Sequence, residues 1–226
     1  MSVPVIAIDG PSGSGKGTVS REVANALGFH LLDSGALYRL VGLAGARAGL
    51  AASDEAGHAR LAARMDVRFG TGADGAEEVR LEGEDVTHAI RTELAGNLAS
   101  KVASFGSVRA ALIERQRGFA KPPGLVADGR DMGTVIFPGA RLKVFLTATA
   151  AERAARRHKQ LKDKGLNVSL ADLSREIAER DQRDSTRQVS PLVAAADAIT
   201  LDSTGLTPEE VVARVLSLAR ERIKGR

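Results

Sequence analysis

A glycine-rich segment near the start of the chain carries the clearest chemistry in the sequence. Residues 10–18 read Gly-Pro-Ser-Gly-Ser-Gly-Lys-Gly-Thr and follow a short apolar run. Glycines let a backbone wrap closely around a phosphate, so that successive N–H groups point at it from a helix N-terminus. Lys16 adds a positive charge for the β- and γ-phosphates. We expect ATP to bind along Gly10, Pro11, Ser12, Gly13, Ser14, Gly15, Lys16, Gly17 and Thr18.

The residue after the lysine departs from the general phosphate-loop pattern. A Ser or Thr usually stands there, whereas this chain has Gly17 followed by Thr18. The Gly-Lys-Gly-Thr form resembles the nucleoside monophosphate kinases. Thr18 is the candidate for a hydroxyl ligand to magnesium, and a role without direct contact stays open. The chain has no Asn-Lys-x-Asp guanine motif, which disfavours a GTPase.

A second set of polar residues follows the apolar run 125–127. Asp128 closes this run, where a carboxylate can hold the hydration shell of a magnesium ion; the alternative is a turn-forming Asp before Gly129. Arg130 and Arg39 carry guanidinium forks that suit a bidentate clamp on an acceptor phosphate. For Arg39 the alternative is a solvated helix arginine, and for Ser34 it is a simple N-cap.

The elements that position these residues alternate between strand and helix. A short apolar run at 3–8 predicts a buried strand, and Val19, Val23 and Leu27 predict a helix that ends at Gly28. Further helices are predicted from Ser34 and from a capping box at Thr207, and further strands at 125–127, 142–146 and 198–201. This order predicts an α/β fold, a doubly wound parallel sheet.

Two regions interrupt the alternation. Residues 65–86 predict an inserted antiparallel hairpin, and 150–190 predict a charged helical pair broken at 164–167, its first helix opened by a capping box at Thr149. We expect one P-loop kinase domain over 1–226. Its core would comprise about 1–28, 124–149 and 192–226. The resemblance to nucleoside monophosphate kinases implies that the inserted region at about 29–123 binds the acceptor and that the region at about 150–191 is a helical lid.

Several strings together resemble the bacterial cytidylate kinase family. They are Leu32-Asp33-Ser34-Gly35-Ala36-Leu37-Tyr38-Arg39, Ser100-Lys101-Val102-Ala103-Ser104-Phe105, Asp128-Gly129-Arg130-Asp131-Met132-Gly133-Thr134 and Arg180-Asp181-Gln182-Arg183-Asp184. The similarity runs nearly end to end, and the string at 128–134 is its most specific part. The resemblance implies transfer of the ATP γ-phosphoryl group to CMP, and also to dCMP, with Mg²⁺.

The resemblance also implies roles for individual residues. Asp131 and Arg109 would read the cytosine edge, since a carboxylate can accept from N4 while an arginine donates to N3 or O2. The implied acceptor-binding set is Ser34, Tyr38, Arg39, Ser100, Arg109, Arg130, Asp131, Arg180, Asp184 and Arg187. The implied catalytic set is Lys16, Arg130, Arg153 and Arg157, the last two from the basic first helix of the lid. Without the resemblance, Arg180–Asp184 is an ordinary i, i+4 surface ion pair, and Asp131 and Arg109 are surface charges.

Composition narrows the function classes further. The chain has no cysteine, a formal net charge of +4 and only 3% aromatic residues. Disulfides and thiolate metal sites are excluded, and base-stacking platforms for nucleic acid are disfavoured. We expect a cytoplasmic monomer with no membrane or nucleic-acid partner. Two rivals stay open: a small-metabolite kinase with UMP or AMP as acceptor, and a regulatory ATPase whose basic lid grips nucleic acid.

Overall fold

The structure is a computed structural model that describes residues 3–71, 77–163 and 165–223. It divides into two compact units. We call residues 1–33 and 116–226 the core unit, and residues 34–115 the inserted unit. Each unit is described by itself.

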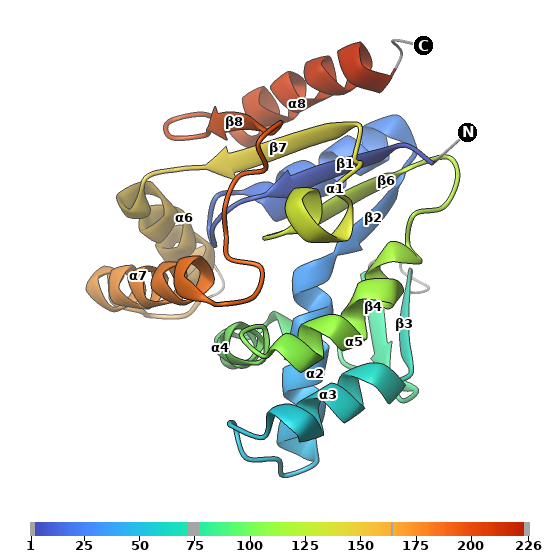
Figure 1. Cartoon of the computed structure of the whole chain (residues 1–226). Helices are drawn as coiled ribbons and strands as arrows, with labels where there is room; N and C mark the ends of the chain where they lie inside the picture. Colours follow the sequence, from blue (N-terminus) through green and yellow to red (C-terminus); the bar gives the residue numbers. More distant parts are fainter. Residues whose placement is uncertain (1–2, 72–76, 164, 224–226) are drawn as a thin grey trace. The chain divides into compact units, whose positions relative to one another are not determined.

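The core unit is built on a five-stranded parallel sheet (Figure 1). Its strands are β1 (Val5–Asp9), β2 (His30–Asp33), β6 (Leu125–Gly129), β7 (Leu142–Thr147) and β8 (Ile199–Asp202). They lie in the order β2-β6-β1-β7-β8, and every pair is parallel. The order changes direction at β1, and open α/β sheets bind their ligands at the carboxyl ends of strands beside such a point. The predicted α/β parallel sheet is confirmed.

Strand alternation decides what covers each face of this sheet. Ile6 and Ile8 pack with α1 (Lys16–Leu27) and α8 (Pro208–Ile223) in one hydrophobic core. Ala7 and Asp9 face the opposite side because successive side chains in a strand alternate. The short π-helical turn η2 (Met132–Ile136) contacts β1 there. Two predicted helix ends are confirmed: Gly28 caps α1 in the left-handed conformation, and Thr207 and Glu210 form the reciprocal capping box of α8.

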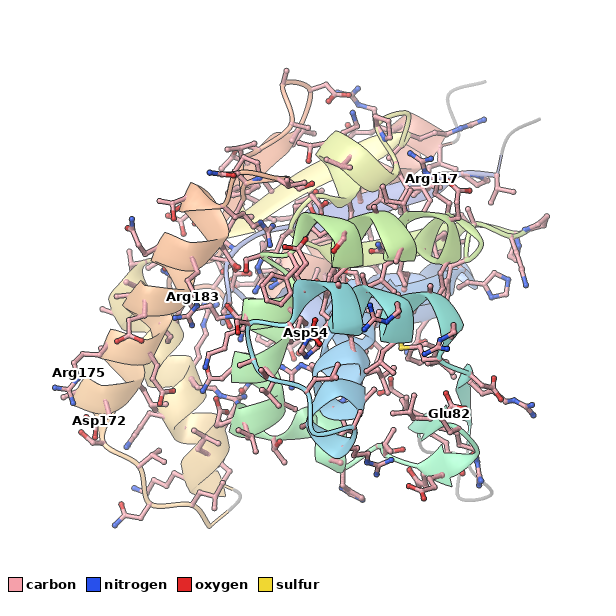
Figure 2. All side chains as sticks on the ribbon, turned by 60° about the horizontal axis from the view of Figure 1, so that its bottom comes forward. Asp54, Glu82, Arg117, Asp172, Arg175 and Arg183 are labelled. Atoms are coloured by element: carbon pink, nitrogen blue, oxygen red, sulfur yellow. The ribbon has the colours of Figure 1, made fainter. Side chains whose placement is uncertain are left out.

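The charged region after β7 forms the predicted pair of helices, α6 (Ala150–Asp163) and α7 (Leu170–Thr186), which pack against each other. Ser169 caps α7, and Asp172 pairs with Arg175 on its exposed first turns (Figure 2). The capping box predicted for α6 is only half formed. Thr149 accepts from the Glu152 N–H group, but its own N–H group donates to Thr204 instead.

The inserted unit is mostly helical. It contains α2 (Ser34–Arg47), α3 (Glu55–Arg64), the 3-10 turn η1 (Ala89–Arg91), α4 (Glu93–Val102) and most of α5 (Gly106–Arg117). A small antiparallel sheet has the order β3 (Val67–Thr71), β4 (Glu77–Leu81), β5 (Glu84–Asp85). This confirms the predicted hairpin, although most of its turn, residues 72–76, lies outside the described residues.

Helix ends in the inserted unit follow side-chain chemistry. Asp54 accepts a hydrogen bond from the Gly57 N–H group at 2.8 Å and so caps α3 (Figure 2). Ser34 is the first helical residue of α2, and its reading as a cap stays an alternative. No helix within the described ranges is long and apolar enough to cross a membrane.

Candidate active site

The phosphate loop connects β1 to α1 at the carboxyl edge of the sheet, and its backbone requires glycine. Gly10 has φ 156°, and a Cβ atom there would lie 2.0 Å from the Leu146 carbonyl oxygen. Gly13 and Gly15 have φ values of 79° and 88°. These values lie in the region that side chains rarely adopt, so the glycine spacing sets the shape of the loop.

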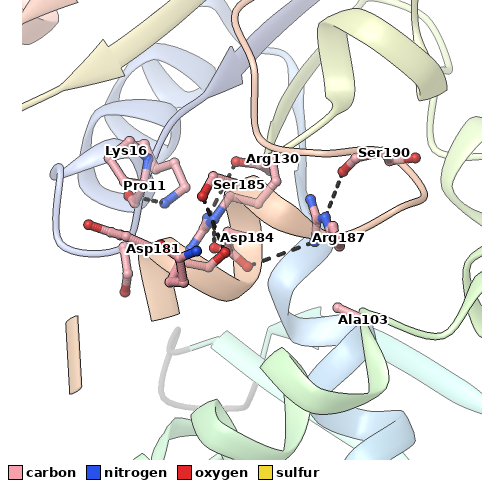
Figure 3. A network of polar contacts seen from close by, with 12 residues as sticks. Pro11, Lys16, Ala103, Arg130, Asp181, Asp184, Ser185, Arg187 and Ser190 are labelled. Atoms are coloured by element: carbon pink, nitrogen blue, oxygen red, sulfur yellow. Dashed lines mark hydrogen bonds and ion pairs between the residues drawn. The ribbon is translucent and has the colours of Figure 1, made fainter. Parts of the chain in front are cut away.

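Lys16 begins α1 and is buried. Its Nζ donates to the Pro11 carbonyl oxygen at 3.0 Å, across the loop (Figure 3). Burial, and secondarily the charge of Arg130, lower the pKa of Lys16 to about 7, against the opposing charge of Asp128. A phosphate at the loop would favour the charged lysine, because an opposite charge nearby stabilises the ionised form.

Asp128 lies against the phosphate loop, at the end of β6. A Cβ atom built on Gly17 would lie 3.4 Å from its Oδ2 atom. Burial raises the pKa of the Asp128 carboxyl to about 7, although Lys16 acts in the other direction. A carboxylate with this burial is poorly solvated and would gain from a cation. Its place inside a buried strand disagrees with the alternative of a simple turn residue.

Asp9 is a buried carboxylate beside the loop that sequence reasoning missed. Its two oxygens accept hydrogen bonds from the N–H groups of Met132 and Gly133, each at 2.8 Å. These bonds fix the turn that follows Asp131. Burial raises the pKa of Asp9 to about 6, because the two hydrogen bonds only partly offset it. The strand pattern contained a signal: Asp9 falls on the face opposite Ile8, away from the apolar core.

Arg130 and Asp184 form a buried ion pair between the end of β6 and α7. Arg130 Nε lies 2.8 Å from Asp184 Oδ2, and Arg187 approaches the same carboxylate at 3.8 Å (Figure 3). Although burial works against the charge of Arg130, this pairing raises its pKa. Asp184 is 5% exposed, so the reading of Arg180–Asp184 as a surface pair is wrong. Arg187 was expected on the same helical face, but α7 ends at Thr186 and Arg187 follows it.

The two lid arginines predicted as catalytic have different surroundings. Arg153 is buried, pairs bidentately with Asp181 at 3.0 and 2.6 Å, and donates to the Ser12 carbonyl oxygen at 3.1 Å. Arg157 is more accessible and donates to Gln160 at 3.3 Å. Arg153 therefore touches the phosphate loop in this structure. Arg156, which sequence reasoning gave no role of its own, also approaches the loop.

Two of the predicted acceptor-binding residues of the inserted unit, Tyr38 and Arg109, form a cation–π pair. The Arg109 guanidinium lies 5.4 Å from the centre of the Tyr38 ring and donates to the Ala103 carbonyl oxygen at 3.2 Å. Arg39 donates to the Ile90 carbonyl oxygen at 2.6 Å. Three of the predicted residues here are buried polar groups: Ser34, Ser100 and Arg109. Arg109 and, in the core unit, Asp131 are 4% and 2% exposed, so neither is a surface charge.

Comparison with known proteins gives one consistent answer. The family model described as cytidylate kinase matches residues 6–221. A cytidylate kinase of Azotobacter vinelandii is 58% identical over 94% of this chain and 93% of its own. One of Methylococcus capsulatus is 54% identical over 97% of this chain and 98% of its own. A solved, uncharacterized protein from Eubacterium ventriosum aligns over 97% of this chain and 99% of its own, with TM-score 0.54 and 11% identity, a likeness of fold alone.

Proposed function

The chain belongs to the cytidylate kinase family, and on that premise we propose that it transfers the γ-phosphoryl group of ATP to CMP, and also to dCMP. The products would be ADP and CDP or dCDP. The observation that carries this proposal is the family match across residues 6–221. The phosphate loop agrees with it, because a buried lysine and a buried carboxylate lie together at the carboxyl edge of the sheet.

Phosphoryl transfer from ATP to CMP requires that the two substrates are positioned and that the charge of their phosphates is neutralised. The phosphate of CMP is already a nucleophile, so the reaction needs no strong general base. The loop N–H groups and Lys16 would hold the β- and γ-phosphates of ATP. Arg130 would hold the acceptor phosphate, and its guanidinium is anchored for this by Asp184. Arg153 and Arg157 stay predictions as groups that act on the transferring phosphoryl group.

The residues present fit magnesium held mainly through water. Mg²⁺ usually keeps several water ligands and takes one or two carboxylates together with substrate phosphates. In the parts of the chain that the structure describes, no group of three or more acidic or histidine side chains could cage a metal. Asp128 is the carboxylate that lies against the loop at Gly17, with Asp33 beside it on the neighbouring strand. We propose that Asp128 holds water ligands of the ion, with Thr18 as a candidate hydroxyl ligand. When bound, Mg²⁺ would neutralise charge on the phosphates.

The acceptor base is proposed to be read by Asp131. Its carboxylate can accept from the N4 amino group of cytosine, whereas uracil presents an oxygen at that position. Asp131 is buried, and the bonds from Met132 and Gly133 to Asp9 hold the turn next to it. A buried hydrogen-bonding group rejects a base that leaves it unpaired. The roles of Ser34, Tyr38, Arg39, Ser100, Arg109, Arg180 and Arg187 toward the acceptor remain proposals.

The test is a coupled assay of ADP release with Mg-ATP and CMP, dCMP, UMP or AMP in separate reactions. We expect the highest kcat/KM for CMP and dCMP. A preference for UMP or AMP would favour the rival of a different acceptor. ADP release that no nucleoside monophosphate stimulates would favour a regulatory ATPase.

A further inference from the structure

Two side chains outside the proposed machinery converge on one carbonyl group of the phosphate loop. They are Arg156, on the second turn of α6, and Ser203, directly after β8. Ser203 Oγ lies 3.2 Å from the Ser14 carbonyl oxygen, and Arg156 Nη1 lies 3.5 Å from the same atom. Arg156 also donates to Ser203 itself, from Nη1 to Oγ at 3.0 Å and from Nη2 to the carbonyl oxygen at 2.6 Å.

The serine alone cannot secure this carbonyl. A hydroxyl group has one proton to donate, and Ser203 Oγ lies even closer to the Thr147 carbonyl oxygen, at 2.9 Å. Arg156 brings a second donor and orients the serine by donating to it. Arg156 is itself held by Glu152, whose Oε1 accepts from its Nε at 2.9 Å. The fork of Arg156 therefore joins α6, the segment after β8 and the phosphate loop.

Holding the Ser14 carbonyl also orients the next N–H group. In a planar trans peptide, the C=O of one residue and the N–H of the next point in opposite directions. With the Ser14 oxygen turned toward Arg156 and Ser203, the Gly15 N–H group is turned away from both. Gly15 immediately precedes α1, at a helix N-terminus where N–H groups bind anions. Glycine rotates more freely than other residues. Without an external restraint, the Ser14–Gly15 peptide could therefore turn its N–H group in other directions.

We propose that Arg156 and Ser203 are positioning residues for the phosphate donor, which fix the Ser14–Gly15 peptide so that the Gly15 N–H group binds the nucleotide phosphates. The proposal rests on the proposed function only in assuming that the loop binds the donor nucleotide. Neither side chain needs to touch the nucleotide. Their loss should therefore weaken donor binding and leave acceptor binding largely unchanged.

The test measures donor binding without any acceptor. The dissociation constant of ADP is determined by calorimetry, and the KM values of ATP and CMP by kinetics, for wild type, Arg156→Ala and Ser203→Ala. We expect Arg156→Ala to raise the ADP dissociation constant and the KM of ATP by about tenfold, and Ser203→Ala to raise them by about threefold. The KM of CMP should stay within about twofold. Arg214→Ala and Ser217→Ala, at exposed positions of α8, are the matched controls.

Arg156→Lys separates geometry from charge. The lysine keeps the positive charge but lacks the planar fork that reaches both Ser14 and Ser203. We expect it to recover only part of the ADP affinity that Arg156→Ala loses. Full recovery would mean that charge near the loop is sufficient, and would overturn the positioning role.

Two further results would also overturn the proposal. One is an ADP dissociation constant that both alanine variants leave within about twofold of wild type. The other is an equal rise in the KM values of ATP and CMP with a lowered Tm, which marks a general structural defect. Failure of the proposed function looks different: CMP would not be phosphorylated, while ADP binding would still follow the expected order of variants.

Discussion

At the scale of single residues, the site combines charged groups that burial keeps from ordinary solvation. Lys16 and Asp128 are both buried, and the pKa of each is moved to about 7, downward for the lysine and upward for the carboxyl. Each group weakens the shift of the other, because opposite charges favour ionisation. A bound phosphate would stabilise the charged form of Lys16, and a bound cation would stabilise the charged form of Asp128. The residues therefore fit a site built for a charged ligand.

Changing Lys16 to Ala should abolish catalysis and preserve the fold. We expect kcat to fall by about a thousandfold or more, because a preorganised charge at the transferring phosphate is lost. Tm should be kept, because Arg130 still stabilises the charge of the buried Asp128 when Lys16 is absent. The measurements are initial rates of ADP release and a thermal melt. A folded Lys16→Ala protein with normal activity would refute the assignment of the phosphate loop.

Changing Asp131 to Asn should relax the choice of base. The amide can turn to donate to uracil O4, so the ratio of kcat/KM for CMP over UMP should fall by at least about tenfold. Steady-state kinetics with both acceptors measures this ratio, and Glu221→Gln, exposed on α8, is the control. If Asp131→Asn keeps the wild-type ratio, the base is read by other groups.

Asp9 should tie stability to pH. Burial raises the pKa of its carboxyl from 3.8 to about 6. Between these values the folded protein binds a proton that the unfolded chain has released. The contribution of Asp9 to the free energy of unfolding is therefore fully present below the lower value and lost as pH rises through the higher one. Two pKa units correspond to about 3 kcal/mol.

Urea unfolding of wild type and Asp9→Asn checks this. The excess stability of wild type over the variant should shrink by up to about 3 kcal/mol from about pH 4 to about pH 7. Asp202→Asn serves as a contrast of opposite sign. Bonds from Thr204 hold the pKa of Asp202 below its usual value, so that stability is lost as pH falls. An Asp9 difference that does not vary with pH would contradict the raised pKa.

At the scale of elements, local sequence signals set the helix ends and tertiary contacts set their polar partners. Gly28 ends α1 and Thr207 caps α8 as predicted, because these signals act within a few residues. The capping box predicted at Thr149 forms only in part, because the Thr149 N–H group donates to the side chain of Thr204, which is distant in sequence. Glu152 then pairs with Arg156. Competition of this kind is invisible in a short sequence window.

Gly28→Ala tests the end of α1. Gly28 has φ 65°, and nothing lies within 4 Å of an added Cβ atom. The cost is therefore backbone strain without a steric clash, and we expect a loss of about 1 kcal/mol in the free energy of unfolding. Gly139→Ala is the control, since its added Cβ is equally unhindered and its φ lies outside the left-handed region. Equal stabilities of the two variants would contradict this account.

At the scale of the whole molecule, the sequence predicted the elements that continuous segments form. It did not predict the side-chain contacts between residues that are distant in sequence. The parallel sheet, the phosphate loop with Lys16, the hairpin and the paired helices α6 and α7 follow from local pattern. The partnership of Arg130 with Asp184 joins residues 54 apart, and that of Asp9 with Met132 joins residues 123 apart. Nothing in composition or periodicity specifies such pairs, because they depend on strand order and on the faces of the sheet.

The central claim is that CMP accepts the phosphoryl group, and a competition experiment tests it most directly. Wild-type protein is given Mg-ATP with equimolar CMP and UMP, and the nucleoside diphosphates are separated by chromatography at early times, with Lys16→Ala as the blank. In such a mixture the product ratio equals the ratio of kcat/KM values. We predict that CDP exceeds UDP by at least about tenfold, the effect of one good base contact. Equal CDP and UDP, or consumption of ATP without CDP, would contradict the account.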